Sequence, residues 1–222
     1  MSGLIRRLFG GGGADDEREY GIRLVFALGN PGAEYARNRR NVGFWVVNKL
    51  AKKHGADFSQ KTGTYALAET EIAGRRIAIA KTRTYNNESG SAVMALIRKL
   101  KLDDAREMMT VCDHLDLPAG KVRIRRSGGG GGQKGMTDII RKTGTDAFPR
   151  VRIGIGRPVV HGEPSRDPEH VAAWVLSDPD PEERRILEAA VDHAIEAIEC
   201  AIADGVEAAM NRYNRDGASD DA

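Results

Sequence analysis

Four segments of the chain combine polar side chains with glycine, proline or a helix start at points where apolar strands are expected to end. They are residues 29–32 (GNPG), 85–90 (YNNESG), 112–116 (CDHLD) and 127–135 (SGGGGGQKG). In open α/β sheets, ligands bind where strands end and loops begin, so these segments form the candidate site. A plain turn would explain the first segment alone, and a helix cap would explain the second, so only the four segments together indicate a site.

The glycine run at 128–132 exposes backbone N–H groups just before an expected helix, an arrangement that attracts anions. It is not a nucleotide P-loop, because Lys134 is followed by Gly135 where that motif needs Ser or Thr. The GNPG segment lacks the third glycine of a dinucleotide-binding motif. The five histidines are scattered, and no His/Cys pair has ligand spacing, so we expect no metal and no cofactor.

Two further residues of this region carry reactive side chains. Cys112 could act as a nucleophile, but a cysteine at the end of an apolar strand is more often buried and inert. His114 could bind a ligand beside Asp113 and Asp116, although a surface histidine is the more common case. Because neighbouring residues of an extended segment point to opposite faces, His114 is expected to face away from Asp113.

Apolar patterns predict the elements that position these segments. Strands are expected at 22–28, 65–72, 75–81, 108–112, 121–126 and 151–155. Helices are expected at about 41–54, 89–102, 133–142, 168–176 and, as one long helix, 182–213. Strands and helices interleave, and the two strands joined at Ala73-Gly74 form an antiparallel hairpin, so the class is α/β with a mixed sheet.

The composition suits one domain. The 222 residues are 41% hydrophobic, enough for a real core, and we expect a domain at 22–214 between an N-terminal tail (1–21) and a disordered C-terminal tail (215–222). No apolar run is long enough to cross a membrane, and the opening MSGLIRRLFGGGG is too poor in apolar residues for a signal peptide. Cys112 and Cys200 cannot build a disulfide scaffold, so we expect a cytoplasmic protein with no membrane partner.

The charges are unevenly distributed along the chain. Residues 1–160 carry 29 Lys+Arg against 16 Asp+Glu (+13), whereas residues 161–222 carry 5 against 16 (−11). A basic body with an acidic end favours a polyanionic partner such as a nucleic acid. A solvated surface on which the signs happen to segregate is the alternative.

Taken in order, the motifs resemble those of the bacterial-type peptidyl-tRNA hydrolase family. The resemblance covers residues 23–214 and is carried by LVFALGNPGAEYARNRRNVGFWVV, TYNNESGSAV, VCDHLDLPAG, GGGGGQKGMTDII and RVRIGIGRP. It implies a single three-layer α/β/α domain with a twisted mixed β-sheet. It also implies a protein of translation and ribosome rescue that acts on peptidyl-tRNA.

The resemblance assigns roles to five residues. Asn30, in GNPG, corresponds to the family's asparagine that positions the substrate and discriminates blocked from free aminoacyl groups. Tyr35 lies where the family contacts tRNA, and Tyr85 and Asn87 correspond to residues that hold the peptide-ester end. Asp113 corresponds to the aspartate that orients the catalytic histidine.

Two positions depart from the family pattern. Arg40 stands where the family has its catalytic histidine, and Lys134 replaces an asparagine expected to bind substrate. A guanidinium cannot accept a proton near neutral pH, so Arg40 cannot act as a general base. We expect Arg40 to form an ion pair with Asp113, and Arg40 and Lys134 to make the pocket favourable for a phosphate or an oxyanion.

Two hypotheses follow, both with tRNA or peptidyl-tRNA as partner and nothing that requires more than a monomer. One is an esterase that hydrolyses the bond between peptide and tRNA with weakened or rearranged base catalysis. The other is an RNA-binding protein that has kept the groove and lost hydrolysis. A folded relic without an RNA partner is a third interpretation, and it predicts no steep salt dependence of binding.

Overall fold

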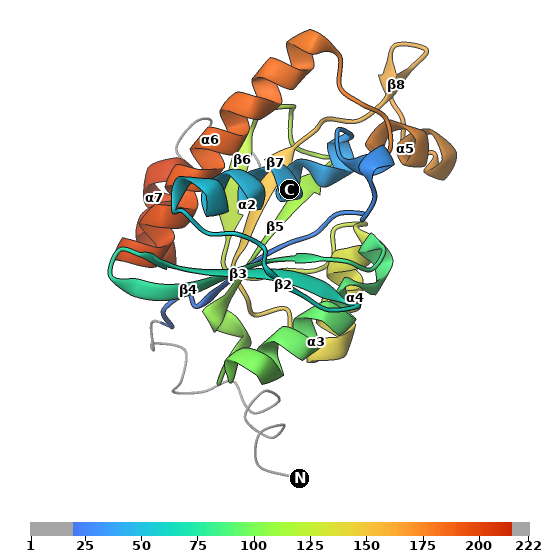
Figure 1. Cartoon of the computed structure of the whole chain (residues 1–222). Helices are drawn as coiled ribbons and strands as arrows, with labels where there is room; N and C mark the ends of the chain where they lie inside the picture. Colours follow the sequence, from blue (N-terminus) through green and yellow to red (C-terminus); the bar gives the residue numbers. More distant parts are fainter. Residues whose placement is uncertain (1–19, 215–222) are drawn as a thin grey trace.

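The computed structural model describes residues 20–214, and within them one mixed sheet holds the site. Its seven strands run in the order β2-β3-β4-β1-β5-β7-β6 (Figure 1). Their bounds are β1 Leu24–Ala27, β2 Gln60–Lys61, β3 Tyr65–Ile72, β4 Arg75–Thr82, β5 Met108–His114, β6 Val122–Arg125 and β7 Arg150–Gly154. The central strands β4, β1, β5 and β7 are parallel, whereas β3 and β6 run antiparallel to their neighbours. The predicted α/β class with a mixed sheet is confirmed.

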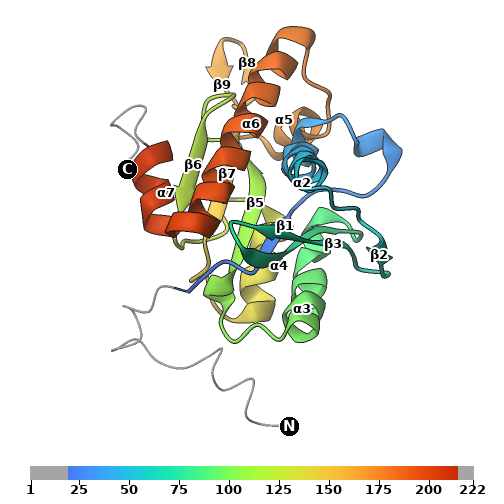
Figure 2. The ribbon, with the colours of Figure 1, turned by 60° about the vertical axis from the view of Figure 1, so that its left-hand side comes forward.

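Helices cover both faces of the sheet. Their bounds are α2 Val42–Lys53, α3 Ser89–Leu100, α4 Lys134–Thr143, α5 Pro168–Val175, α6 Pro181–Asp204 and α7 Val206–Tyr213. Because side chains alternate along a strand, Val25 and Ala27 of β1 pack with α2, α6 and α7, while Leu24 and Phe26 pack with α3 and α4. Both views show these two helix groups on opposite sides of the sheet (Figures 1 and 2). This is the expected three-layer α/β/α arrangement.

The C-terminal helical region differs from the prediction. The single helix expected over 182–213 is two helices, α6 and α7, separated by Gly205. Gly205 has φ 95° and ψ 160°, a conformation that glycine adopts without strain and that no helix continues. The apolar stripe runs across the break, which is why periodicity alone predicted one helix.

Several short elements also escaped prediction. They are β2, the small hairpin of β8 (Val159–Val160) and β9 (Glu163–Pro164), and the single 3-10 turns η1 (Ala33–Tyr35), η2 (Arg39–Asn41), η3 (Asn86–Glu88) and η4 (Ala105–Glu107). Two or three residues are too few for a hydrophobic period to develop. Three of the 3-10 turns, η1, η2 and η3, carry the predicted site residues Tyr35, Arg40 and Asn87.

The expected tails lie almost wholly outside the described residues, which include only Tyr20 and Gly21 of the first and none of the second. The extent of the single domain stays a prediction. No helix among residues 20–214 is long and apolar enough to span a membrane.

Candidate functional site

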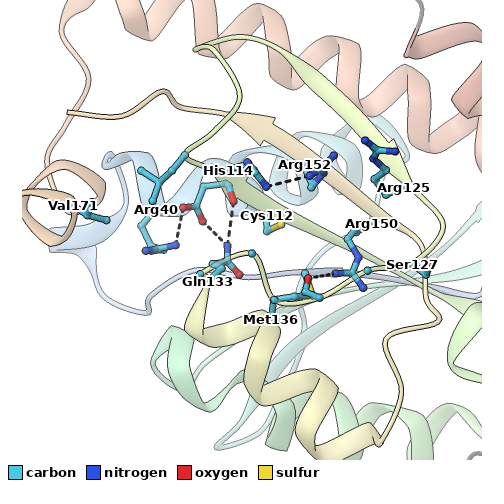
Figure 3. Close-up of a pocket in the computed structure, with 17 residues that line it drawn as sticks. Arg40, Cys112, His114, Arg125, Ser127, Gln133, Met136, Arg150, Arg152 and Val171 are labelled. Atoms are coloured by element: carbon cyan, nitrogen blue, oxygen red, sulfur yellow. Dashed lines mark hydrogen bonds and ion pairs between the residues drawn. The ribbon is translucent and has the colours of Figure 1, made fainter. Parts of the chain in front are cut away.

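A cavity of about 530 Å³ lies between the glycine run and the sheet (Figure 3). Its walls come from the ends of β5 and β6, from the first residues of β7, from the start of α4, from η2 and from Val171 of α5. The side chains used below are Arg40, Asp113, His114, Arg125, Gln133, Arg150 and Arg152. The cavity therefore joins two of the four segments that the sequence singled out, at 112–116 and 127–135, to Arg40.

Asp113 is the centre of a small buried network at the end of β5. Its carboxylate accepts a hydrogen bond from Arg40 NH1 at 2.6 Å and one from Gln133 Nε2 at 2.8 Å. The side chain of Asp113 is 2% exposed and that of Arg40 is 14% exposed, so the ion pair is shielded from water. The expected Arg40–Asp113 ion pair is confirmed, and it leaves the carboxylate holding a cation rather than an imidazole.

Three arginines form the other half of the cavity. Arg125 comes from β6, and Arg150 and Arg152 come from the neighbouring strand β7. Arg150 donates to the carbonyl oxygens of Gly129 and Asp146, each at 2.9 Å, and so fixes the glycine run above the sheet. Within residues 20–214, none of these three guanidiniums forms an ion pair with a carboxylate, and the buried Nε atoms of Arg150 and Arg152 have no hydrogen-bond partner.

The charge balance of the cavity follows from these contacts. Burial lowers the pKa of Arg150 and of Arg152, because desolvation penalises their charged forms. Arginine nevertheless stays protonated in proteins, so the cavity holds four guanidiniums against the single carboxylate of Asp113. Buried charge without a counter-charge is costly, and guanidinium forks match the geometry of phosphate oxygens. The cavity is therefore suited to a phosphate or another oxyanion.

The arginine row was missed in the sequence, although a signal for it exists. Arg123 and Arg125 alternate with apolar residues in β6, and Arg150 and Arg152 do so in β7. Val122, Ile124, Val151 and Ile153 face the core on the other side of the sheet. A strand with one apolar face and one arginine face indicates a covered, cation-lined surface.

Asn30 fastens the first two segments to each other. Its side-chain oxygen accepts from the Asn86 backbone N–H at 2.9 Å, and its own backbone N–H donates to Asn41 Oδ1 at 2.8 Å. A Cβ at Gly135 would lie 2.5 Å from the Asn86 carbonyl oxygen, so the start of α4 approaches η3 closely and requires glycine there. The segments at 29–32, 85–90 and 127–135 are therefore neighbours at one edge of the sheet.

The remaining predicted residues lie outside the arginine-lined cavity. Tyr85 is 57% exposed, Asn87 and Lys134 are exposed, and Tyr35 is half-buried in η1. Neither they nor Asn30 are among the residues that line it. Lys134 is the first residue of α4, and Gln133 beside it is the residue that reaches Asp113.

Cys112 is buried and has no disulfide partner. Burial raises the pKa of its thiol to about 12, so the sulfur stays protonated at neutral pH. The expectation of a buried, inert cysteine fits this environment better than the nucleophile alternative.

His114 lies on the side of β5 opposite to Asp113, as strand alternation predicts, but this does not keep the two residues in separate sites. His114 was predicted to face away from Asp113, yet both residues line the same cavity. His114 follows the alternation, since it lies on the same side of β5 as Cys112 and faces the glycine run. Asp113 lies at the end of β5, where Gln133 before α4 and Arg40 of η2 donate hydrogen bonds to its carboxylate. The cavity extends around this end of the sheet and so includes both Asp113 and His114.

These features define an α/β protein with a cationic pocket beside its central sheet, and the chemistry of that pocket suits an anionic ligand. Comparison with known proteins makes the class specific. A family model described as peptidyl-tRNA hydrolase matches residues 24–221. The chain belongs to the peptidyl-tRNA hydrolase family.

Individual relatives agree. The chain is 43% identical over 191 residues to the peptidyl-tRNA hydrolase of Chloroflexus aggregans, covering 86% of this chain and 98% of that protein. It is 40% identical over 193 residues to the one from Dehalococcoides mccartyi, covering 87% and 100%. A crystal structure of peptidyl-tRNA hydrolase from Acinetobacter baumannii superposes with a TM-score of 0.81 at 32% identity, covering 90% of this chain and 97% of that one.

Proposed function

We propose that this protein binds the 3′ end of peptidyl-tRNA and hydrolyses the ester between peptide and tRNA, at a rate lowered by the absence of a histidine at position 40. Membership of the family supports the substrate and the reaction. The observation that carries the lowered rate is the Arg40–Asp113 ion pair at 2.6 Å. Water must lose a proton as it attacks the ester carbonyl. Arg40 cannot accept that proton, so in this proposal the Asp113 carboxylate beside it takes up the proton in place of an imidazole.

In this proposal each site residue has a separate task. Asn30 positions the substrate while it holds the GNPG segment against η3. Tyr85 and Asn87 hold the peptide-ester end, and Tyr35 and Lys134 contact the tRNA. Arg40 and Asp113 lie at the reacting end, where the guanidinium stabilises the negative charge that develops on the carbonyl oxygen.

A second candidate is an RNA-binding member of the family without hydrolysis. The Arg40–Asp113 ion pair favours it as well, because this pair occupies the carboxylate that would otherwise orient a base. The basic pocket serves either candidate. In both, we infer a cytoplasmic protein that works as a monomer.

The deciding experiment is ester cleavage of an N-blocked aminoacyl-tRNA by the purified full chain. We expect slow cleavage above the uncatalysed background, abolished in Asp113→Ala. Cleavage that survives in Asp113→Ala, or none above background in the wild type, contradicts the hydrolase proposal. In the second case, retained tRNA binding identifies the RNA-binding alternative.

Binding itself should depend steeply on salt. We expect Arg152→Ala to weaken tRNA binding and to lower the slope of log K against log [salt] by about 1, the value for one lost phosphate contact. Arg185→Ala is the matched control, since Arg185 is exposed on the acidic helix α6 and should leave the slope unchanged. Equal slopes for the wild type and Arg152→Ala would show that no RNA phosphate binds at Arg152 in this pocket.

A further inference from the structure

His114 lies in the cationic half of the cavity, where the mechanism above gives it no task. Its ring faces the glycine run, and a Cβ at Gly131 would lie 3.7 Å from His114 Nε2. His114 Nε2 is 3.1 Å from Arg152 NH1 (Figure 3). His114 Nδ1 is 3.2 Å from the Asp116 backbone nitrogen. The ring is half-buried.

The two polar neighbours of the ring are both hydrogen-bond donors. A neutral imidazole has one acceptor nitrogen and one donor nitrogen, so it can satisfy Arg152 or the Asp116 N–H but not both. A protonated ring satisfies neither. These two contacts therefore disfavour the charged form of His114 on geometric grounds alone.

Charges around the ring act in the same direction on balance. The pKa of His114 is lowered below its ordinary value by burial first and by Arg152 of β7 second. Arg157 adds to this effect, while Asp116 and Asp113 oppose it. Arg125 of β6 also lines the cavity and adds a further positive charge to it. These charges therefore favour the uncharged ring, as the hydrogen-bond geometry does.

An anion in the cavity reverses this balance. Phosphate oxygens accept hydrogen bonds from Arg152 and from a protonated imidazole alike, so the donor conflict disappears. The added negative charge also stabilises the imidazolium. We propose that His114 is an anion ligand of this pocket and that its ring takes up one proton from solvent when a phosphate group enters.

Linkage gives the consequence for affinity. Because the anion favours proton uptake, protonation favours the anion by the same factor. Binding tightens as the pH falls through the interval between the pKa of His114 in the complex and its lower pKa in the free protein. Within that interval the gain approaches tenfold per pH unit. This inference rests on the proposed function only for the source of the phosphate, which is RNA.

The test follows the ring protons of the full chain by NMR as a function of pH, with and without sulfate. Sulfate is the probe because its own charge does not change between pH 5 and 8. His114→Asn, which keeps a polar side chain without titrating, assigns the signal. We expect saturating sulfate to raise the pKa of His114 by about 1 or more. The other four histidines are the internal control for ionic strength.

A His114 titration midpoint that sulfate leaves unchanged would overturn the inference. So would the absence of any sulfate effect on the signals of the pocket, because the cavity would then hold no anion. Both outcomes can be read in the same titration series.

A second arm separates RNA from a free anion as the ligand. The ratio of tRNA affinities at pH 6.0 and pH 7.5 is measured for the wild type and for His114→Asn, so that titration of the RNA's own phosphates cancels. A larger ratio in the wild type supports His114 as a ligand of an RNA phosphate. If sulfate shifts the His114 titration but the two tRNA ratios agree, the anion site stands and RNA does not occupy it.

Discussion

An Arg40→His variant is expected to cleave N-blocked aminoacyl-tRNA faster than the wild type by about 10²- to 10⁴-fold, the usual value of a positioned general base. The site is already arranged for the imidazole. Asp113 is held by Gln133 Nε2 at 2.8 Å and keeps its second oxygen directed at position 40, where Arg40 NH1 now lies 2.6 Å away. A histidine there can donate to Asp113 from one nitrogen and accept a proton from water at the other.

Arg40→Gln is the matched control for this gain. It removes the same charge and breaks the same ion pair, but it supplies no group that titrates near neutral pH. We expect Arg40→Gln to remain slow, and Arg40→His to show a rate that rises with pH as the imidazole loses its proton. If the two variants cleave at equal rates, the positive charge of Arg40 limits the wild type, and the lack of a general base does not.

The double variant Arg40→His/Asp113→Asn tests the orientation of the ring. Asparagine keeps the size of the side chain but cannot stabilise an imidazolium. We expect the double variant to lose a large part of the rate increase that Arg40→His shows over the wild type. If the double variant is as fast as Arg40→His, then Asp113 does not orient the base and has only a structural role.

The sequence could predict one partner of Asp113 in this site but not the other. The Arg40–Asp113 ion pair was predictable because the family resemblance places Arg40 at the position of the histidine that the aspartate at position 113 orients. The partner of Asp113 on the other side, Gln133, was not. Its role depends on how α4 starts, after five glycines whose backbone conformation the sequence leaves open: Gly128, Gly131 and Gly132 all have positive φ.

The placement of His114 shows a different limit. Alternation correctly gives opposite sides of β5 for Asp113 and His114, but the cavity wraps around the end of the sheet and includes both. A local rule about side-chain direction therefore says nothing about which cavity a residue reaches. The same reasoning applies to Gly205, where the apolar stripe continues across a break that only the backbone dihedral reveals.

Arg39, the neighbour of Arg40, is expected to be the residue of this region on which the stability of the fold depends most. Its side chain is 5% exposed and forms an ion pair with Glu183 of α6, with Nε 2.7 Å from Oε1. It also stacks on the Trp174 ring of α5, 3.6 Å from the centroid, and donates to Ser177 Oγ at 2.7 Å. One side chain thus joins η2 to α5, to the loop after it and to the first turn of α6.

Replacing Arg39 with alanine leaves Glu183 nearly buried without its partner, the situation in which breaking an ion pair is most destabilising. We expect a loss of about 3 kcal/mol in the free energy of unfolding, measured from the midpoint of urea denaturation. Arg37→Ala is the control, because Arg37 is 79% exposed and lies 3.6 Å from Asp178. Its loss should be within about 1 kcal/mol.

If Arg39→Ala and Arg37→Ala both lowered the free energy of unfolding by the same small amount, the contacts of Arg39 would contribute no more than a surface ion pair does. If only Arg39→Ala is destabilised, the two adjacent arginines have separate tasks: Arg39 fixes η2 against α5 and α6, and η2 in turn holds Arg40 at Asp113. The gain expected for Arg40→His should then shrink in the Arg39→Ala background even at temperatures where the protein stays folded, because an imidazole displaced by about 1 Å from its partner loses much of its catalytic value.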